Sequence, residues 1–178
     1  MSRLFETVAD LAAGRETLRR RAYGVIEIAD GRLQCIRLRP YPKIVTALGI
    51  LLWGQWRHRH AAGDRVWLYY NQPRRFPNFL VLKYVVSSRG ASLASFRRAL
   101  ETLDELARIK RSDALLCDVA NWRISRPMLE RAGWTPHCPS RWHRHYIKRF
   151  YGQWTPRPAW LERLFCDNSP APAEKLVV

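Results

Sequence analysis

The stretch FLVLKYVVSSRGASLASFRRALETLDELARIKRSDALLCDV, residues 79–119, decides the fold of this chain. Residues 79–86 are a run of β-branched and aromatic residues with the length of a strand. The polar cluster 87–92 favours a turn, and Ser92 stands where it can cap a following helix. Residues 114–119 are a second short apolar run. The stretch therefore predicts a strand, a turn, a helix and a strand.

The expected helix, Leu93–Lys110, has apolar residues at alternating spacings of three and four, namely Leu93, Phe96, Leu100, Leu103 and Ala107. A helix with such a stripe packs on a sheet. We therefore expect the two strands to be parallel neighbours joined by a right-handed crossover. Ligands of such sheets bind at the carboxyl ends of the strands, which here are followed by residues 87–92 and 120–123.

The remaining segments predict a single α/β (α+β) domain over residues 23–166, with a mixed sheet around this central βαβ unit and helices on both faces. Alternating runs around Asp30-Gly31 predict a hairpin over 23–38. Apolar periodicity predicts a helix over 43–60 and a strand over 64–71. Residues 1–22 are expected to form a helical arm, with its helix over 2–21. Residues 167–178 are expected to form a flexible tail.

The charge and the cysteine content indicate which binding partners and which cellular compartment to expect. The net charge of +16 on 178 residues implies an anionic partner, which could be nucleic acid, a membrane surface or a phosphate-bearing ligand. A basic surface that serves only solubility is the alternative. Four scattered cysteines without a C-x-x-C pair indicate reduced thiols and a cytoplasmic protein. The longest apolar run, 44–53, is too short to span a bilayer, so no transmembrane segment is expected.

A second stretch, DVANWRISRPMLERAGW (118–134), follows the βαβ unit and is more specific. The strand ends before Asn121, Ser125 can cap a short helix, Ile124 can pack on Leu129, and Gly133 can close the helix. A strand, an asparagine, a short helix and a Gly-aromatic pair in this order resemble the GNAT superfamily, the acyl-coenzyme-A-dependent N-acyltransferases. The resemblance covers roughly residues 79–151, and it implies a GNAT-like fold.

The resemblance implies an acyl-CoA cofactor, acetyl-CoA in the simplest case, and transfer of its acyl group to an amine. Two parallel strands would splay apart, and the pantetheine arm would pair with Tyr84, Val85 and Val86. The turn of Arg89, Gly90, Ala91 and Ser92, at the start of the long helix, would hold the pyrophosphate, because unpaired amides and the helix dipole attract anions. Asn121 would contact the same arm with its side-chain amide.

Acid–base groups are expected on the segment after Trp134. Many GNAT enzymes use a tyrosine of the short helix as an acid, and alignment on Gly133 puts Leu129 at that position. Residues 141–151 alternate as a strand would, with His145 on one face and Tyr146 on the other. His145, His137 and Tyr146 are therefore the candidate catalytic residues, with a histidine as the base for the amine. Histidines that only decorate a half-exposed strand are the alternative. The spacing does not fit a zinc site, so no metal is predicted.

The same strand also allows a function without catalysis. Its basic and aromatic residues interleave, and such a pattern suits single-stranded nucleic acid, because bases stack on aromatic rings while cations follow the phosphates. No named nucleic-acid motif is present. The alternative function is thus a basic protein on a GNAT-like fold that binds nucleic acid or a membrane surface, with Arg141, Arg144 and Arg149 as contacts. The oligomeric state and the acyl acceptor stay open.

Overall fold

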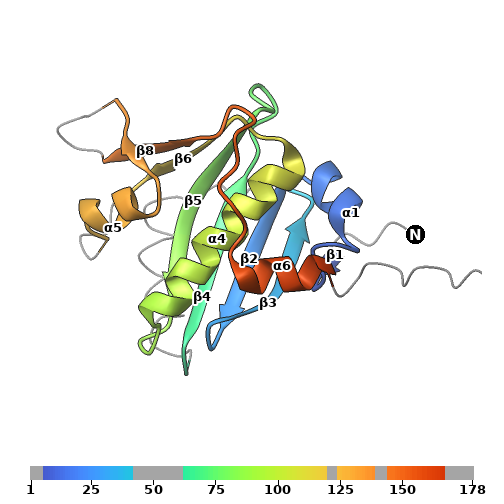
Figure 1. The fold of residues 1–178 in the computed structure, drawn as a ribbon, viewed down its shortest axis with the longest axis vertical. Coiled ribbons are helices and arrows are strands. Elements are labelled where there is room, and N and C mark those ends of the chain that lie inside the picture. Colours follow the sequence, from blue (N-terminus) through green and yellow to red (C-terminus); the bar gives the residue numbers. More distant parts are fainter. Residues whose placement is uncertain (1–5, 42–61, 120–123, 139–143, 167–178) are drawn as a thin grey trace, which may run out of the picture.

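The structure is a computed structural model that describes residues 6–41, 62–119, 124–138 and 144–166. It folds into one mixed α/β domain with strands and helices interspersed along the chain (Figure 1). The elements in chain order are β1 (Glu6–Val8), α1 (Arg15–Arg20), β2 (Tyr23–Ala29), β3 (Arg32–Arg39), β4 (Arg65–Asn71), β5 (Phe79–Ser87), α4 (Leu93–Lys110), β6 (Ala114–Asp118), α5 (Arg126–Arg131), β7 (Thr135–Pro136), β8 (His145–Arg149) and α6 (Ala159–Cys166).

The strands form one eight-stranded sheet in the order β1-β3-β2-β4-β5-β6-β8-β7. The pair β5 and β6 is parallel, and the other neighbours are antiparallel. Helix α4 connects the parallel pair and lies across the sheet (Figure 1). The βαβ unit expected from the sequence is therefore confirmed, together with the mixed sheet around it.

Helix α4 begins and ends at the residues that local chemistry favours. The Ser92 side chain accepts a hydrogen bond from the Ser95 amide, and Arg111 ends the helix in the left-handed conformation with φ 54°. Leu100, Leu103 and Ala107 of the predicted stripe are buried against the sheet, whereas Leu93 is 67% exposed. The fully buried part of the stripe therefore starts later than expected, and Leu93 lies outside the core.

The predicted hairpin forms β2 and β3, and both residues of its turn have positive φ, 50° at Asp30 and 68° at Gly31. These angles match the tight turn that suits twisted strands. The turn is tied to α4, because the Gly31 amide donates to Ser95 Oγ at 2.8 Å and Arg98 Nε donates to the Gly31 carbonyl at 3.1 Å. The hairpin and the helix therefore hold each other in place.

The single helix expected over residues 2–21 is wrong in the described part of that range. Residues Glu6–Val8 form β1, which pairs with β3, and only Arg15–Arg20 are helical. The Asp10 carboxylate accepts from the Ala12 amide at 2.7 Å, and this local bond favours a turn over a continuous helix. The apolar residues still reach the core, since Leu11 and Leu18 are fully buried.

The described segments after β6 comprise α5, β7 and β8, of which β8 and β7 complete the sheet beyond β6, and the segment after β8 returns across α4 (Figure 1). Ser125 caps α5, and Gly133 follows the helix with φ 82°, as predicted. The strand expected over 141–151 is shorter, 145–149 in β8, and the chain turns at Tyr151 and Gly152, which both have positive φ. The helix expected over 43–60 lies outside the described residues. Among the described helices, none is long and apolar enough to cross a bilayer.

Candidate functional site

The pairing of the two parallel strands ends one residue before the end of β6, whereas β5 continues to Ser87. Paired residues run from Phe79 and Ala114 to Leu82 and Cys117. Beyond them β5 continues along β4, while Asp118 of β6 pairs with β8. The register of β4 against β5 also shifts at this point, so that Lys83 is an extra residue on β5. We call the place where β5 and β6 separate the fork.

Lys83 and Asp118 are the first residues beyond the last shared pair, one on each strand of the fork. Both side chains are exposed, although they lie in the middle of the sheet order. An exposed charge at the centre of a sheet indicates that solvent, or a ligand from it, reaches the strands at that point. The fork is therefore open enough for charged groups.

A row of polar side chains crosses the sheet beside the fork. Asp118 is paired with His145 in register, and the His137 amide donates to the His145 carbonyl at 2.9 Å. Because residues opposite each other in antiparallel strands share a face, all three belong to one face of the sheet. His145 Nδ1 lies 3.9 Å from Asp118 Oδ1, with the two side chains 38% and 45% exposed. The His137 ring Nε2 lies 3.4 Å from Cys138 Sγ.

The third catalytic candidate lies elsewhere. Tyr146 is 4% exposed and belongs to the core under α4, on the opposite face from the two histidines. Leu129, at the position where many GNAT enzymes have a tyrosine, is 3% exposed in the same core. The structure thus brings His137 and His145 together with Asp118 and separates them from Tyr146.

The predicted phosphate-binding turn is occupied in part by a carboxylate of the protein itself. Asp64 Oδ1 accepts from the Ser92 amide at 2.8 Å, and Asp64 Oδ2 accepts from Ser92 Oγ at 2.6 Å and Ser95 Oγ at 2.7 Å. Burial alone would raise the pKa of Asp64, but the hydrogen bonds from Ser92 and Ser95 lower it below its usual value. Both donors of Ser92 are therefore already engaged.

Close contact with the preceding loop explains the rest of this turn. The Ser88 hydroxyl donates to the Gly63 carbonyl at 2.6 Å and accepts from the Arg65 amide at 3.0 Å. A Cβ at Gly90 would lie 3.0 Å from that same carbonyl, so glycine is needed there for packing. Arg89 is exposed and Ala91 is half-buried.

The strand segment expected to meet the cofactor alternates between the two faces. Tyr84 stacks on Tyr69 with ring centroids 4.2 Å apart, and Val86 belongs to the same cluster, whereas Val85 packs against the core under α4. Asn121 lies outside the described residues. The expected cofactor residues on β5 are thus on the stretch that follows the fork.

A cavity of about 780 Å³ lies between α4 and α5, the helices that follow the two separating strands. Its remaining wall is the segment 154–158, which crosses α4 (Figure 1). The apolar part of the lining includes Leu93, Phe96, Leu100, Met128, Trp154 and Leu161. The charged part comprises Arg97, Arg108, Arg131, Lys148 and Arg157, and the carboxylates of Glu101, Asp104 and Glu105. Cations thus outnumber carboxylates, which favours an anionic ligand.

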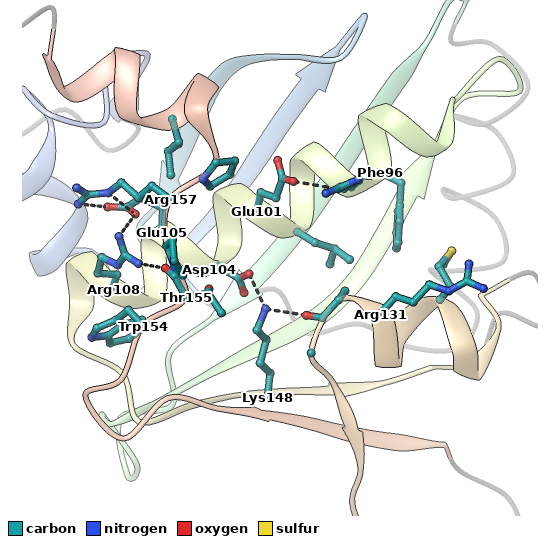
Figure 2. A pocket seen from close by; sticks show the side chains of 18 of the residues that line it. Phe96, Glu101, Asp104, Glu105, Arg108, Arg131, Lys148, Trp154, Thr155 and Arg157 are labelled. Atoms are coloured by element: carbon teal, nitrogen blue, oxygen red, sulfur yellow. Dashed lines mark hydrogen bonds and ion pairs between the residues drawn. The ribbon is translucent and has the colours of Figure 1, made fainter.

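Lys148 and Asp104 form a largely buried ion pair in the cavity wall (Figure 2). Lys148 Nζ lies 2.7 Å from Asp104 Oδ2 and donates to the Ala132 carbonyl at 2.7 Å. Burial raises the pKa of Asp104 to about 6, although Lys148 lowers it in part. A Cβ at Gly133 would lie 3.2 Å from Lys148 Cε, so the glycine also leaves room for this side chain.

Two further carboxylates of α4 hold the segment that crosses the helix. Arg157 donates two hydrogen bonds of 2.9 Å to Glu105, which is 2% exposed, and Arg108 approaches the same carboxylate at 3.4 Å (Figure 2). Trp160 Nε1 donates to Glu101 Oε2 at 2.7 Å. We call residues 154–166 the C-terminal strap.

Sequence reasoning missed Lys83, Asp118 and Asp64, and it missed the Asp104–Lys148 pair. The local pattern marks Asp64 only as the start of a strand, and nothing local marks it as a partner of a turn 28 residues later. Asp118 was the one residue with a usable signal, because it ends an apolar strand at the expected ligand edge. The described residues contain no group of three or more His, Cys, Asp or Glu side chains close enough to hold a metal ion.

Comparison with known proteins finds similarity to a solved structure but not to a family model. No family model matches the chain, and no curated protein matches it. The crystal structure of nourseothricin acetyltransferase is similar over 83% of this chain and 99% of that chain, with 12% sequence identity and a TM-score of 0.38. A likeness at this level carries no conclusion about activity, and the function of the present chain has to come from its own site.

Proposed function

We propose that this protein is an acyl-CoA-dependent N-acyltransferase that transfers an acyl group, acetyl in the simplest case, to an amine. The observation that carries the proposal is the fork, where pairing between parallel β5 and β6 ends at Leu82 and Cys117. A strand that loses its neighbour offers a pairing edge to an extended ligand that contains amides. The cavity between the two following helices supplies room for the remainder of such a ligand.

The residues present fit an acyl-CoA at the fork and in the cavity. A volume of about 780 Å³ lies within the ~300–1,000 Å³ of typical ligand pockets. The apolar walls suit an adenine and a pantetheine arm, and Arg97 and Arg131 border the gap from α4 and α5. The N-terminal turn of α4 fits less well, because Asp64 already engages Ser92. We therefore assign the phosphates to Arg89, Arg97 and Arg131 with the Gly90–Ala91 backbone, rather than to Ser92.

The segment Tyr84–Val86 would run beside the pantetheine arm, and Asn121 completes the proposed binding set. Bound there, acetyl-CoA would supply a thioester, the activated carbonyl that an amine attacks; the carbon–sulfur bond would break and CoA would leave as a thiolate that takes a proton from solvent. His145 would accept the proton that the amine loses, and Asp118 would orient the His145 ring from 3.9 Å away. His137 stands beside His145 and is the second candidate for this role. Tyr146 has no role here, because its side chain is buried on the other face.

Isothermal titration with acetyl-CoA, with CoA as a second ligand, tests the proposal. We expect Arg89→Ala to weaken binding by ~1–2 kcal/mol, because a charge-assisted contact to a partly exposed phosphate is lost. Arg32→Ala, which removes an equally exposed arginine at the β2–β3 turn, should leave binding unchanged. Gly90→Val should weaken binding more than Arg89→Ala does, since its Cβ would meet the Gly63 carbonyl.

A second arm separates binding from chemistry. His145→Gln should bind acetyl-CoA as the wild type does and transfer the acetyl group to amines more slowly. Leu129→Tyr is not expected to restore an acid, because the new hydroxyl would be buried in the core. Absence of acetyl-CoA and CoA binding at millimolar concentration would refute the proposal. Normal binding with unchanged transfer in His145→Gln would refute only the role of that histidine.

A further inference from the structure

We propose that the loops at the end of the sheet opposite the fork form a binding surface for single-stranded nucleic acid. The surface consists of residues 72–78 between β4 and β5, residues 111–113 before β6, and residues 149–153 at the end of β8. We call it the loop-end surface. It lies where β5 and β6 begin, whereas the proposed acyl-transfer site lies where they separate, and it is inferred independently of that function.

Backbone hydrogen bonds join these three loops into one surface. The Asp113 amide donates to the Asn78 carbonyl at 2.7 Å. The Phe150 amide donates to the Asp113 carbonyl at 2.8 Å, and the Tyr151 amide approaches the same carbonyl at 3.3 Å. Segments far apart in the sequence are therefore held side by side by short contacts through a single residue.

The surface carries a concentrated positive charge. Arg74, Arg75, Arg111 and Arg149 are all exposed, and Asp113 is the one acidic residue of the three loops. Within the part of the chain that the structure describes, none of these four arginines forms an ion pair with a carboxylate. Elsewhere three exposed arginines, Arg37, Arg97 and Arg126, face a glutamate. Arg149 donates to Thr135 Oγ1 at 3.3 Å, a neutral partner that leaves its charge uncompensated. Charge without an acidic partner is what an anionic ligand requires.

Two exposed aromatic rings stand among these arginines. Phe76 is 56% exposed and Tyr151 is 69% exposed, on separate loops of the surface. Bases stack on such rings, and guanidinium groups bind phosphates and stack as well. A membrane surface would favour a continuous apolar face, whereas these two rings are on separate loops that also carry exposed arginines. Unpaired bases can reach an exposed ring, so the chemistry favours a single strand over a duplex.

The loop that carries Phe76 is held in its shape by its own contacts. The Phe76 amide donates to the Pro73 carbonyl and the Phe79 amide to the Phe76 carbonyl, both at 3.1 Å. Gln72 Nε2 donates to the Pro77 carbonyl at 2.6 Å, and Lys110 Nζ in turn lies 2.9 Å from Gln72 Oε1. A loop fixed before binding loses little conformational freedom when a ligand arrives.

The position of this surface differs from the one that the sequence favours. Arg144, one of the three arginines expected to contact nucleic acid on the last strand, donates to the carbonyls of Val119 and Ile124 instead. Arg141 lies outside the described residues. Of the three, only Arg149 belongs to the loop-end surface. The other arginines of that surface are on loops that are far from Arg149 in the sequence.

Fluorescence anisotropy with a labelled mixed-sequence DNA strand of about 20 nucleotides, longer than the ~4–16 nucleotides that known modules cover, tests the proposal. The affinity of the wild type should fall as salt rises. Arg74→Ser combined with Arg75→Ser should flatten the slope of log affinity against log salt by about 1.4, because each lost phosphate contact removes ~0.7. Phe76→Ala should weaken binding about 5- to 160-fold at fixed salt, the range for one lost stacking contact, without a change of slope. Phe76→Trp should retain binding.

The matched control is Arg32→Ser combined with Arg163→Ser, which removes the same charge from the β2–β3 turn and from α6. Equal losses in the control and in the Arg74–Arg75 variant would overturn the proposal, because binding would then follow net charge alone. Stronger binding of the matching duplex would overturn it too. The proposal would also be overturned if vesicles of phosphatidylserine and phosphatidylcholine competed with the strand and if vesicle binding depended on the same residues. The proposal would likewise be overturned if the wild type did not bind the strand at about 50 mM salt.

Discussion

Asp64 shows how one side chain changes the meaning of a motif. A helix N-terminus with a serine cap normally offers its amides to an anion. Here the anion is a carboxylate of the same chain, which binds the Ser92 amide, the Ser92 hydroxyl and the Ser95 hydroxyl. The pKa of Asp64 is lowered by these hydrogen bonds, so the carboxylate contributes stability above a pH of about 4 that is lost as the pH falls further. The turn therefore fixes the start of α4 to the residue before β4, in addition to being a candidate binding element.

Lys148 and Asp104 give a prediction at the same scale. Lys148→Met should lower the free energy of unfolding by ~3–5 kcal/mol at pH 7.5, because a buried carboxylate loses its cation. The pKa of Asp104 is raised to about 6, so between the unfolded value near 4 and this value the folded state holds a proton that the unfolded state has released. The contribution of this group to stability therefore falls as the pH rises through that window. Loss of Lys148 raises the pKa of Asp104 further.

The deficit of Lys148→Met should thus be smaller at pH 5 than at pH 7.5, where the carboxylate is charged. Urea unfolding at both pH values measures this difference. Lys83→Met, which removes an exposed lysine from β5 of the same sheet, is the control and should change stability by less than ~0.5 kcal/mol. A deficit that is independent of pH would show that packing of the lysine stem, and not its charge, stabilises the wall of the cavity.

At the scale of elements, α4 holds structure on both of its sides. One side packs its apolar stripe on the sheet, and the other binds the C-terminal strap through Glu101 and Glu105. Among the strap side chains that the structure describes, Leu161 is fully buried, and Trp154, Trp160 and Phe165 are partly buried against the core. The position of the strap therefore depends on polar contacts with α4 as well as on this apolar packing.

Arg157→Ala should consequently loosen the strap without unfolding the domain. We expect faster amide hydrogen exchange over residues 154–166 and unchanged exchange in β4, β5 and α4, because two charge-assisted hydrogen bonds of ~1.5–3 kcal/mol each are lost only there. Arg163→Ala is the matched variant, since within the described residues its side chain hydrogen-bonds only to the Ala159 carbonyl of its own helix. Exchange that rises equally throughout the chain in Arg157→Ala would mean that the strap is part of the global folding unit.

At the scale of the whole molecule, the net charge of +16 acts against compactness. Thirty-one basic residues face fifteen acidic ones, and the acids that the structure describes are largely used in internal contacts. The remaining cationic side chains are exposed to solvent and repel one another over long distances. Salt therefore screens this repulsion more than it screens the attraction within the buried ion pairs.

The melting temperature should therefore rise between about 50 and 500 mM NaCl, by ~3 °C for each kcal/mol of repulsion that is relieved in a domain of this size. Scanning calorimetry in NaCl measures the change, and sodium acetate at equal ionic strength checks that screening rather than chloride binding is responsible. A melting temperature that falls with salt would show that attractive ion pairs outweigh the repulsion.

The sequence by itself determined the elements whose causes are local. Hydrophobic periodicity, the Ser92 and Ser125 caps and the Asp30-Gly31 turn predict α4, α5 and the hairpin, because each depends on residues within a few positions of one another. The parallel pair β5 and β6 follows from the crossover helix between them. The N-terminal segment was misjudged, since its apolar residues suit a helix until pairing with β3 is taken into account.

Only the tertiary structure decided the site. It brings Asp118, His145 and His137 into one row, sets the fork one residue before Asp118, and moves Tyr146 to the opposite face. It also puts Asp64 on the turn that was expected to hold phosphate, and Asn78, Asp113 and Phe150 in contact at the loop end. These contacts join residues far apart in the chain, and their register depends on the whole sheet. A local pattern contains no information about that register, which is why the sequence predicted the kinds of chemistry present but not where they meet.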